Sequence, residues 1–130
     1  MTELPDPASP KHAVLFGDPP TKADKEGAAL AHLSLFVIHF AGPLIVYLMY
    51  KDQSVYVRYH AMQAMILYVA LVVISAGLAV GIFLFSMLTC GLGSVLYALL
   101  TPIALVPLWP AWKAYNGDWD GIPGFNQFGR

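Results

Sequence analysis

Charged side chains are scarce in this chain, and their absence from two long stretches indicates the solvent in which it folds. Only 12% of the 130 residues are Asp, Glu, Lys or Arg, against roughly 25% in a soluble domain. Residues 61–112 are 52 consecutive positions without one of them, and residues 27–50 are a second such stretch of 24. With 58% apolar residues, so short a chain could not hide this surface in a soluble core. The composition predicts an integral membrane protein.

Several other features are missing, and each absence excludes a class of function. Cys90 is the only cysteine, so the chain forms no internal disulfide. The net charge of −1 offers no basic surface, so we expect no nucleic-acid partner. The sequence contains no nucleophile elbow, phosphate loop, zinc-ligand spacing or acid pair, and the apolar stretches contain no carboxylate. We therefore expect no enzyme activity, no cofactor and no metal.

The longer charge-free stretch must turn back on itself inside a bilayer. As one helix it would extend about 78 Å at ~1.5 Å per residue, whereas the hydrocarbon core is only about 30 Å thick. The glycines within residues 90–94 make this segment the expected reversal. We predict an all-α polytopic membrane fold with three transmembrane helices, at about residues 27–50, 62–87 and 94–113, of which the second and third form a tight hairpin.

Three segments are expected along the chain. They are an irregular proline-rich tail over residues 1–21, a transmembrane helical domain over residues 22–114, and a turn-rich interfacial tail over residues 115–130. The domain should begin with a helix, because Thr21 and Asp24 have the spacing of a capping box.

Prolines interrupt two of the predicted membrane helices. A proline inside a helix removes one backbone donor and frees the carbonyl four residues earlier. Pro43 therefore predicts a kink near residues 39–43 of the first helix. Pro102, Pro107 and Pro110 predict a bent third helix that packs against its neighbours.

His32 and His39 are the polar residues of the first membrane helix. In one continuous helix, residues seven apart lie within about 20° of the same face. An ionisable group within a membrane is a candidate for function, so both histidines are candidate cofactor-binding residues for a proton relay, a metal or a haem. The alternative is a neutral imidazole that forms a hydrogen bond between helices beside the Pro43 kink.

Polar residues at the ends of the apolar stretches suit contacts at the membrane surface or with partners. Asp52 or Ser54 can cap a helix that begins near residue 55. Arg58 and His60 can bind lipid headgroups, contact the loop after the third helix, or simply reach the interface. The predicted interfacial or partner-contact residues are Asp52, Ser54, Arg58, His60, Lys113, Asn116 and Gly117.

Gly77 and Gly81 form a GxxxG pair in the second membrane helix. Such pairs let two helices approach closely in a membrane. They predict a helix-packing surface, used within the chain or with another protein.

Two groups of residues carry a resemblance to a known family: residues 31–34, 42–45, Tyr47, 51–54, Val57, Arg58 and His60, and the closing residues 112–117 with Pro123. They resemble the Tic20-like membrane proteins of bacteria, the DUF4870 group. The resemblance implies a helical membrane protein related to the protein-import machinery of the chloroplast inner envelope, which has four membrane helices. Ala64-Met65-Ile66 departs from the pattern, because family members often carry an asparagine there.

The leading functional hypothesis is an accessory or structural subunit of a larger membrane complex, whose partners are the lipid bilayer and other membrane proteins or further copies of the chain. One alternative is a Tic20-like translocation or small-solute channel formed as an oligomer. A second alternative is a haem- or quinone-binding redox subunit. We expect the bacterial inner membrane, with the C-terminus in the cytoplasm, because four of the seven Lys and Arg residues lie on that side of a three-helix topology.

Overall fold

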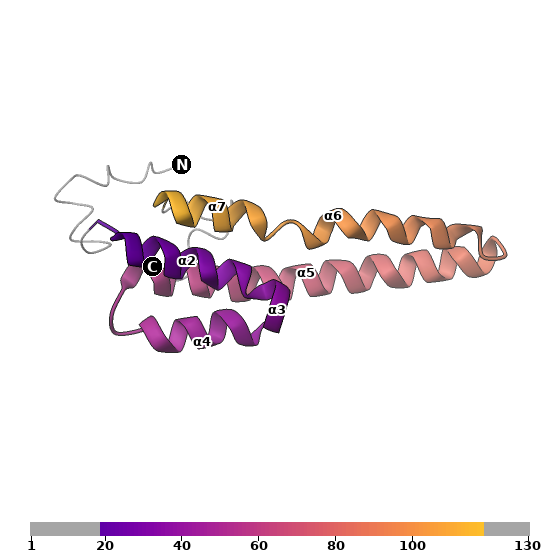
Figure 1. Cartoon of the computed structure of the whole chain (residues 1–130). Coiled ribbons are helices and arrows are strands. Elements are labelled where there is room, and N and C mark those ends of the chain that lie inside the picture. Colours follow the sequence, from indigo (N-terminus) through magenta and orange to yellow (C-terminus); the bar gives the residue numbers. More distant parts are fainter. Residues whose placement is uncertain (1–18, 119–130) are drawn as a thin grey trace, which may run out of the picture.

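The computed structural model describes residues 19–118, and within this range the chain contains helices and no strand. The predicted all-α class is therefore confirmed. Figure 1 shows two parts. We call the first part the body: it contains α2 (Lys22–Leu33), α3 (Leu35–Ile38), α4 (Ala41–Tyr50), α7 (Leu108–Asn116) and the first half of α5 (Val55–Leu88). We call the second part the arm: the rest of α5 lies alongside η1 (Leu92–Leu100) and α6 (Thr101–Ala104) and extends beyond the body.

The capping box predicted at the start of the first helix is present. The backbone N–H of Asp24 donates to Thr21 Oγ1 at 3.2 Å, and the backbone N–H of Thr21 donates to Asp24 Oδ2 at 2.9 Å. Two donors that the helix leaves free are thus satisfied, which fixes the start of α2 at Lys22.

The chain reverses direction after α2, where a single kinked helix was predicted. His39 has φ 50° and ψ −133°, a backbone conformation that no α-helix contains. Pro43 cannot continue a helix through residue 39, but it fits the first turn of a new one, α4. Gly42 lets α4 begin against α2, because a Cβ there would overlap the side chain of Ser34. As a result α2 and α4 lie side by side in the body (Figure 1).

α5 is a single helix of 34 residues. Its start at Val55 is confirmed, and its end at Leu88 is one residue beyond the predicted end of the second crossing. Ser54 caps its first turn, since Ser54 Oγ accepts from the backbone N–H of Val57 at 3.3 Å. At ~1.5 Å per residue the helix is about 51 Å long. It therefore belongs to the body at its start and to the arm at its end.

The arm turns back at Thr89–Gly91, one residue earlier than the predicted segment 90–94. Cys90 and Gly91 both have positive φ, 52° and 93°, and the backbone N–H of Gly91 donates to the carbonyl of Ser86 at 2.8 Å. The returning segment is bent, as its prolines predict, with a break between α6 and α7 that ends at Pro107.

Two segments are long and apolar enough to cross a membrane: α5, and the run Leu92–Asn116 that includes η1, α6 and α7. The predicted continuous crossing over residues 27–50 is wrong, because the reversal at His39 divides it into α2, α3 and α4. α4 has 10 residues, so it extends about 15 Å, half the hydrocarbon thickness. The described chain has two candidate crossings rather than three.

The body has a core of small and aromatic side chains. One cluster joins Ala28, Tyr56, Tyr59 and Ala114 from α2, α5 and α7, and a second joins Ala31, Val46, Val57 and Ala61 from α2, α4 and α5. The small residues of α2 allow α5 and α7 to approach closely. The arm has no comparable cluster among the described residues, and many of its apolar side chains are exposed, among them Val73, Leu88 and Leu92.

Candidate functional site

A group of polar side chains is buried inside the body. His32 of α2 and His60 and Gln63 of α5 are each 0% exposed. His60 and Gln63 are three residues apart and lie on one face of α5. The imidazole rings of His32 and His60 are 5.8 Å apart, centroid to centroid, and nearly perpendicular. We call these three residues the buried polar cluster.

His60 is the centre of this cluster. Its Nε2 lies 2.9 Å from the backbone carbonyl oxygen of Asp118, just after α7. Its ring also lies 4.6 Å from that of Tyr56 and 5.4 Å from that of Tyr59. Of the roles predicted for His60, the structure shows the contact with the segment after the third helix. A headgroup contact requires exposure, which this side chain does not have.

Tyr56 reinforces the same connection between α5 and the end of α7. Its hydroxyl donates to the carbonyl of Ala114 at 2.7 Å and lies 3.2 Å from that of Asp118. Gly117 ends α7 in a left-handed conformation, φ 89°, which lets the backbone N–H of Asp118 donate to the carbonyl of Lys113 at 3.1 Å. The predicted residue Gly117 therefore has a helix-capping position.

His32 is fully buried in the body. Burial, together with the neighbouring His60, lowers the pKa of His32 from 6.5 to about 3. His32 is therefore neutral at physiological pH. Neither of its ring nitrogens has a hydrogen-bond partner among the described residues.

His39 does not join His32, because the chain reverses between them. His39 is exposed and lines a cavity of about 390 Å³, together with Phe36, Tyr68, Ser75 and Pro107. Its ring lies 6.0 Å from that of Tyr68. The prediction that both histidines share one helix face is wrong, and it fails because it assumed a continuous helix.

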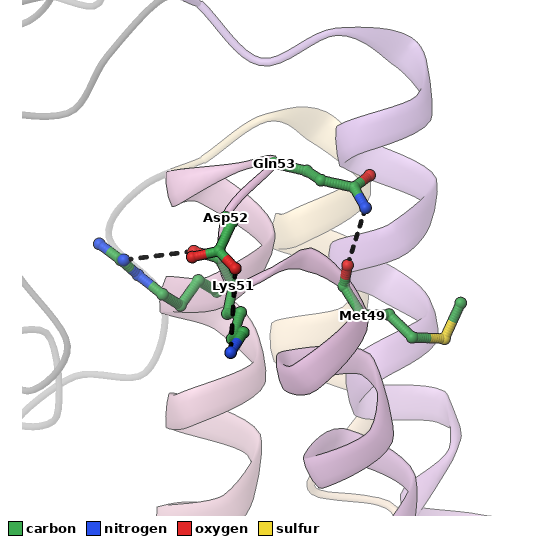
Figure 2. A network of polar contacts seen from close by, with 5 residues as sticks. Met49, Lys51, Asp52 and Gln53 are labelled. Carbon is green, nitrogen blue, oxygen red and sulfur yellow. Dashed lines mark hydrogen bonds and ion pairs between the residues drawn. The ribbon is translucent and has the colours of Figure 1, made fainter.

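The predicted contact residues of the α4–α5 turn lie at an exposed end of the body. Lys51 Nζ lies 3.9 Å from Asp52 Oδ2, and Gln53 Nε2 donates to the carbonyl of Met49 at 3.0 Å; Figure 2 draws both contacts. The Arg58 guanidinium donates to the carbonyl of Lys51 at 3.4 Å. These contacts hold the turn and leave Lys51 and Asp52 largely in contact with solvent.

The C-terminal contact residues lie at the same end as this turn. Lys113 Nζ is 6.0 Å from the Trp109 ring centroid, and Asn116 Nδ2 donates to the carbonyl of Trp112 at 3.0 Å. Gly117 packs beside the side chain of Lys25 of α2. The predicted tail beyond residue 118 and the N-terminal tail before residue 19 lie outside the described residues.

Gly77 and Gly81 lie on an open face of the arm. A Cβ built on either glycine would meet nothing within 4 Å among the described residues. The GxxxG pair therefore does not form the contact between α5 and η1. A packing role toward another protein stays a prediction.

Sequence reasoning missed Gln63 and Tyr56. Gln63 is a polar residue inside the charge-free stretch, one helical turn after His60, and this spacing was a usable signal. The partners of Tyr56 are carbonyl groups about sixty residues away, and nothing in the local sequence indicates such a contact.

Fold and site together define a small helical membrane protein with a buried polar cluster near its charged end. Residues 23–126 match the MamF/MmsF family, described as the magnetosome magnetite crystal formation protein family. The match covers most of the chain, and the chain belongs to this family. The resemblance to Tic20-like or DUF4870 proteins is thereby corrected, and with it the translocation hypothesis. No curated protein and no solved structure matches the chain.

Proposed function

We propose that the chain is a non-enzymatic membrane protein that serves magnetite crystal formation by packing against other membrane proteins or further copies of itself. The family supports the process, since its description names magnetosome magnetite crystal formation. The open glycine face of the arm supports the mode of action. Two glycines one turn apart, with nothing against them in the described chain, suit the close approach of a second helix in lipid.

The distribution of charge supports an orientation in the membrane. Every charged side chain of the described residues lies on α2, on the α4–α5 turn, in the first turns of α5, or at the end of α7 and just after it. These segments meet at one end of the body (Figure 1). Their basic members are Lys22, Lys25, Lys51, Arg58 and Lys113.

The positive-inside rule favours the cytoplasm for this charged end of the body. We infer that the two crossings form a hairpin whose tip, at Thr89–Gly91, faces the opposite side. Both α2 and the end of α7 then face the cytoplasm. This agrees with the C-terminal orientation expected from the sequence, although the number of crossings differs. In a bacterium, the membrane in which the protein is embedded would be the inner membrane or a compartment derived from it.

The packing proposal is tested by filling the glycine face in a magnetosome-forming bacterium. Gly77→Leu with Gly81→Leu should leave the fold intact, because both positions face open space. We expect the double variant to alter the size of magnetite crystals in electron micrographs, and we expect deletion of the gene to have the same effect. Ala76→Leu, an equally exposed neighbour on a different face, is the matched control and should give normal crystals.

Native mass spectrometry of gently solubilised membranes supplies the physical measurement. Assemblies with a partner or a second copy should be present for the parent chain and for Ala76→Leu, and should be lost in the double variant. A lone monomer for the parent under all mild conditions, together with normal crystals for the double variant, would contradict the proposal.

A further inference from the structure

Several side-chain nitrogen and oxygen atoms of the buried polar cluster lack a hydrogen-bond partner among the described residues. His32 Nδ1 and Nε2, His60 Nδ1, and Gln63 Nε2 and Oε1 are all buried, and none has a hydrogen-bond partner among the described residues. Buried polar atoms in native proteins nearly always have a partner, and those without one require an explanation. Five such atoms on three side chains call for a bound water or ion as their partner.

The hydrogen bond of His60 determines which of its nitrogens is available. The Asp118 carbonyl can only accept, so His60 Nε2 must carry the proton and donate it. In the neutral ring Nδ1 then has a free lone pair. A histidine that binds a metal characteristically donates its other N–H to a carbonyl or carboxylate, which orients the ring. His60 has this arrangement.

We propose that His60 Nδ1, one ring nitrogen of His32 and Gln63 Oε1 bind a divalent first-row transition-metal ion. Imidazole nitrogen is a favoured ligand for such ions. Two imidazoles bound to one ion at about 2.1 Å from each nitrogen have ring centroids roughly 5 to 6.5 Å apart, and the rings of His32 and His60 are 5.8 Å apart. Helices also present metal ligands three residues apart, as at His60 and Gln63.

The third ligand is an amide, and this distinguishes the site from common metal centres. The described residues contain no group of three His, Cys, Asp or Glu side chains that could hold a metal. Three neutral ligands leave the charge of the ion uncompensated. The carboxylates of Asp24 and Asp118 provide negative charge nearby, since both act electrostatically on Tyr56, whose ring packs against His60.

Fe(II) is the ion to test first, a choice that rests on the proposed function because magnetite is an iron oxide. Full-length protein in detergent is stripped with chelator and titrated anaerobically with Fe(II), and separately with Co(II), whose absorption bands report nitrogen ligands. We expect a single equivalent to bind. His32→Gln and His60→Gln should each weaken binding at least tenfold. His39→Gln, the same substitution at an exposed histidine, is the matched control and should bind like the parent.

A gain-of-affinity variant keeps the test informative if the histidine variants unfold. Gln63→Glu places a carboxylate in the ligand set, so metal should bind at least tenfold more tightly and should raise the melting temperature of this variant. Failure of both the parent and Gln63→Glu to bind metal would overturn the proposal, and so would equal weakening by His39→Gln. The cluster would then hold ordered water only.

The outcome is separable from that of the crystal-formation experiment. Metal binding with normal crystals in the Gly77→Leu, Gly81→Leu strain would preserve the site and contradict the packing proposal. Altered crystals together with no metal binding would support the packing proposal and overturn the metal site.

Discussion

The imidazole of His60 and the backbone carbonyl of Asp118 lie 2.9 Å apart, although 58 residues separate them in the chain. This contact and those of Tyr56 join the first turns of α5 to the end of α7. The two segments are the cytoplasmic ends of the two proposed crossings. The buried polar cluster therefore lies where the membrane hairpin is closed, and its integrity should determine the stability of the body.

Tyr56→Phe tests this closure. The substitution removes the Tyr56 hydroxyl that donates to the Ala114 carbonyl, which then keeps only the backbone N–H of Gly117 as a partner. We expect a loss of about 0.5–1.5 kcal/mol in the free energy of unfolding, measured by thermal or denaturant unfolding in detergent. Tyr115→Phe changes an exposed tyrosine of α7 and should have no measurable effect. Equal stability of the two variants would show that the hydrogen bonds of Tyr56 contribute little to the free energy of unfolding.

The stability of the metal-free protein should depend on pH through His32. Burial lowers the pKa of His32 in the folded state to about 3, from 6.5 in the unfolded chain. The folded state therefore excludes a proton that the unfolded state binds. The part of the free energy of unfolding that depends on a neutral His32 is fully present above pH 6.5. It is lost as the pH falls toward the folded-state pKa of His32.

The expected slope is about 1.4 kcal/mol per pH unit below the unfolded pKa. Unfolding measured between about pH 7 and about pH 5 should show a slope at least this steep, and His32→Gln should make the slope shallower. Asp24 does not contribute to the change in stability between about pH 7 and about pH 5. Burial raises the pKa of Asp24, but hydrogen bonds from Thr21 and Ser54 outweigh burial and lower that pKa below its usual 3.8. A parent chain with constant stability across the window would contradict the assignment.

The sequence predicted the long helix, both N-terminal caps and the bent return segment, because these depend on local signals: hydropathy, hydroxyl caps and prolines. It failed at residues 27–50, where hydropathy alone cannot distinguish a helix that crosses from two short helices that pair. The deciding contacts are tertiary. Gly42 packs against Ser34, and the alanines of α2 pack against α5 and α7.

The candidate site was only partly predictable for the same reason. His32 and His60 were each singled out, but their proximity depends on how α2 packs against α5. His39 was paired with His32 through a helical periodicity that the reversal removes. Gln63 was missed in the sequence because a single amide hardly changes the mean hydropathy of a long apolar segment.

The strained backbone at His39 should be relieved by glycine. A non-glycine residue at φ 50° and ψ −133° carries a penalty of about 1–3 kcal/mol. His39→Gly should therefore stabilise the protein by about 1 kcal/mol after the entropy of glycine is counted. Val37→Gly, at an exposed helical position, should destabilise it by a similar amount. If both variants lower the melting temperature equally, His39 is not strained.

Two glycines should respond in opposite ways to the same substitution. Gly42→Ala places a methyl group against the side chain of Ser34, the residue that follows α2, so a loss of about 1–3 kcal/mol is expected from overpacking. Gly77→Ala adds the same group in open space within α5 and should stabilise the helix by about 0.5–1 kcal/mol. Unfolding curves in detergent compare the two. Changes of the same sign would show that the α2–α4 pair separates readily.

The native Cys90 provides a direct test of the two-crossing orientation. It is exposed at the tip of the arm and is the only cysteine of the chain. If the charged end of the body faces the cytoplasm, Cys90 faces away from it. A membrane-impermeant maleimide should then label Cys90 in cells whose outer membrane alone is opened.

The matched control moves the thiol to the other end of the molecule. Cys90→Ser combined with Gln53→Cys places it in the exposed α4–α5 turn, among the basic residues. This variant should be labelled only after the inner membrane is opened as well. The reverse pattern would invert the orientation. Labelling of both positions from one side would mean that the arm does not cross, and that α5 and the run Leu92–Asn116 lie along the membrane instead of through it.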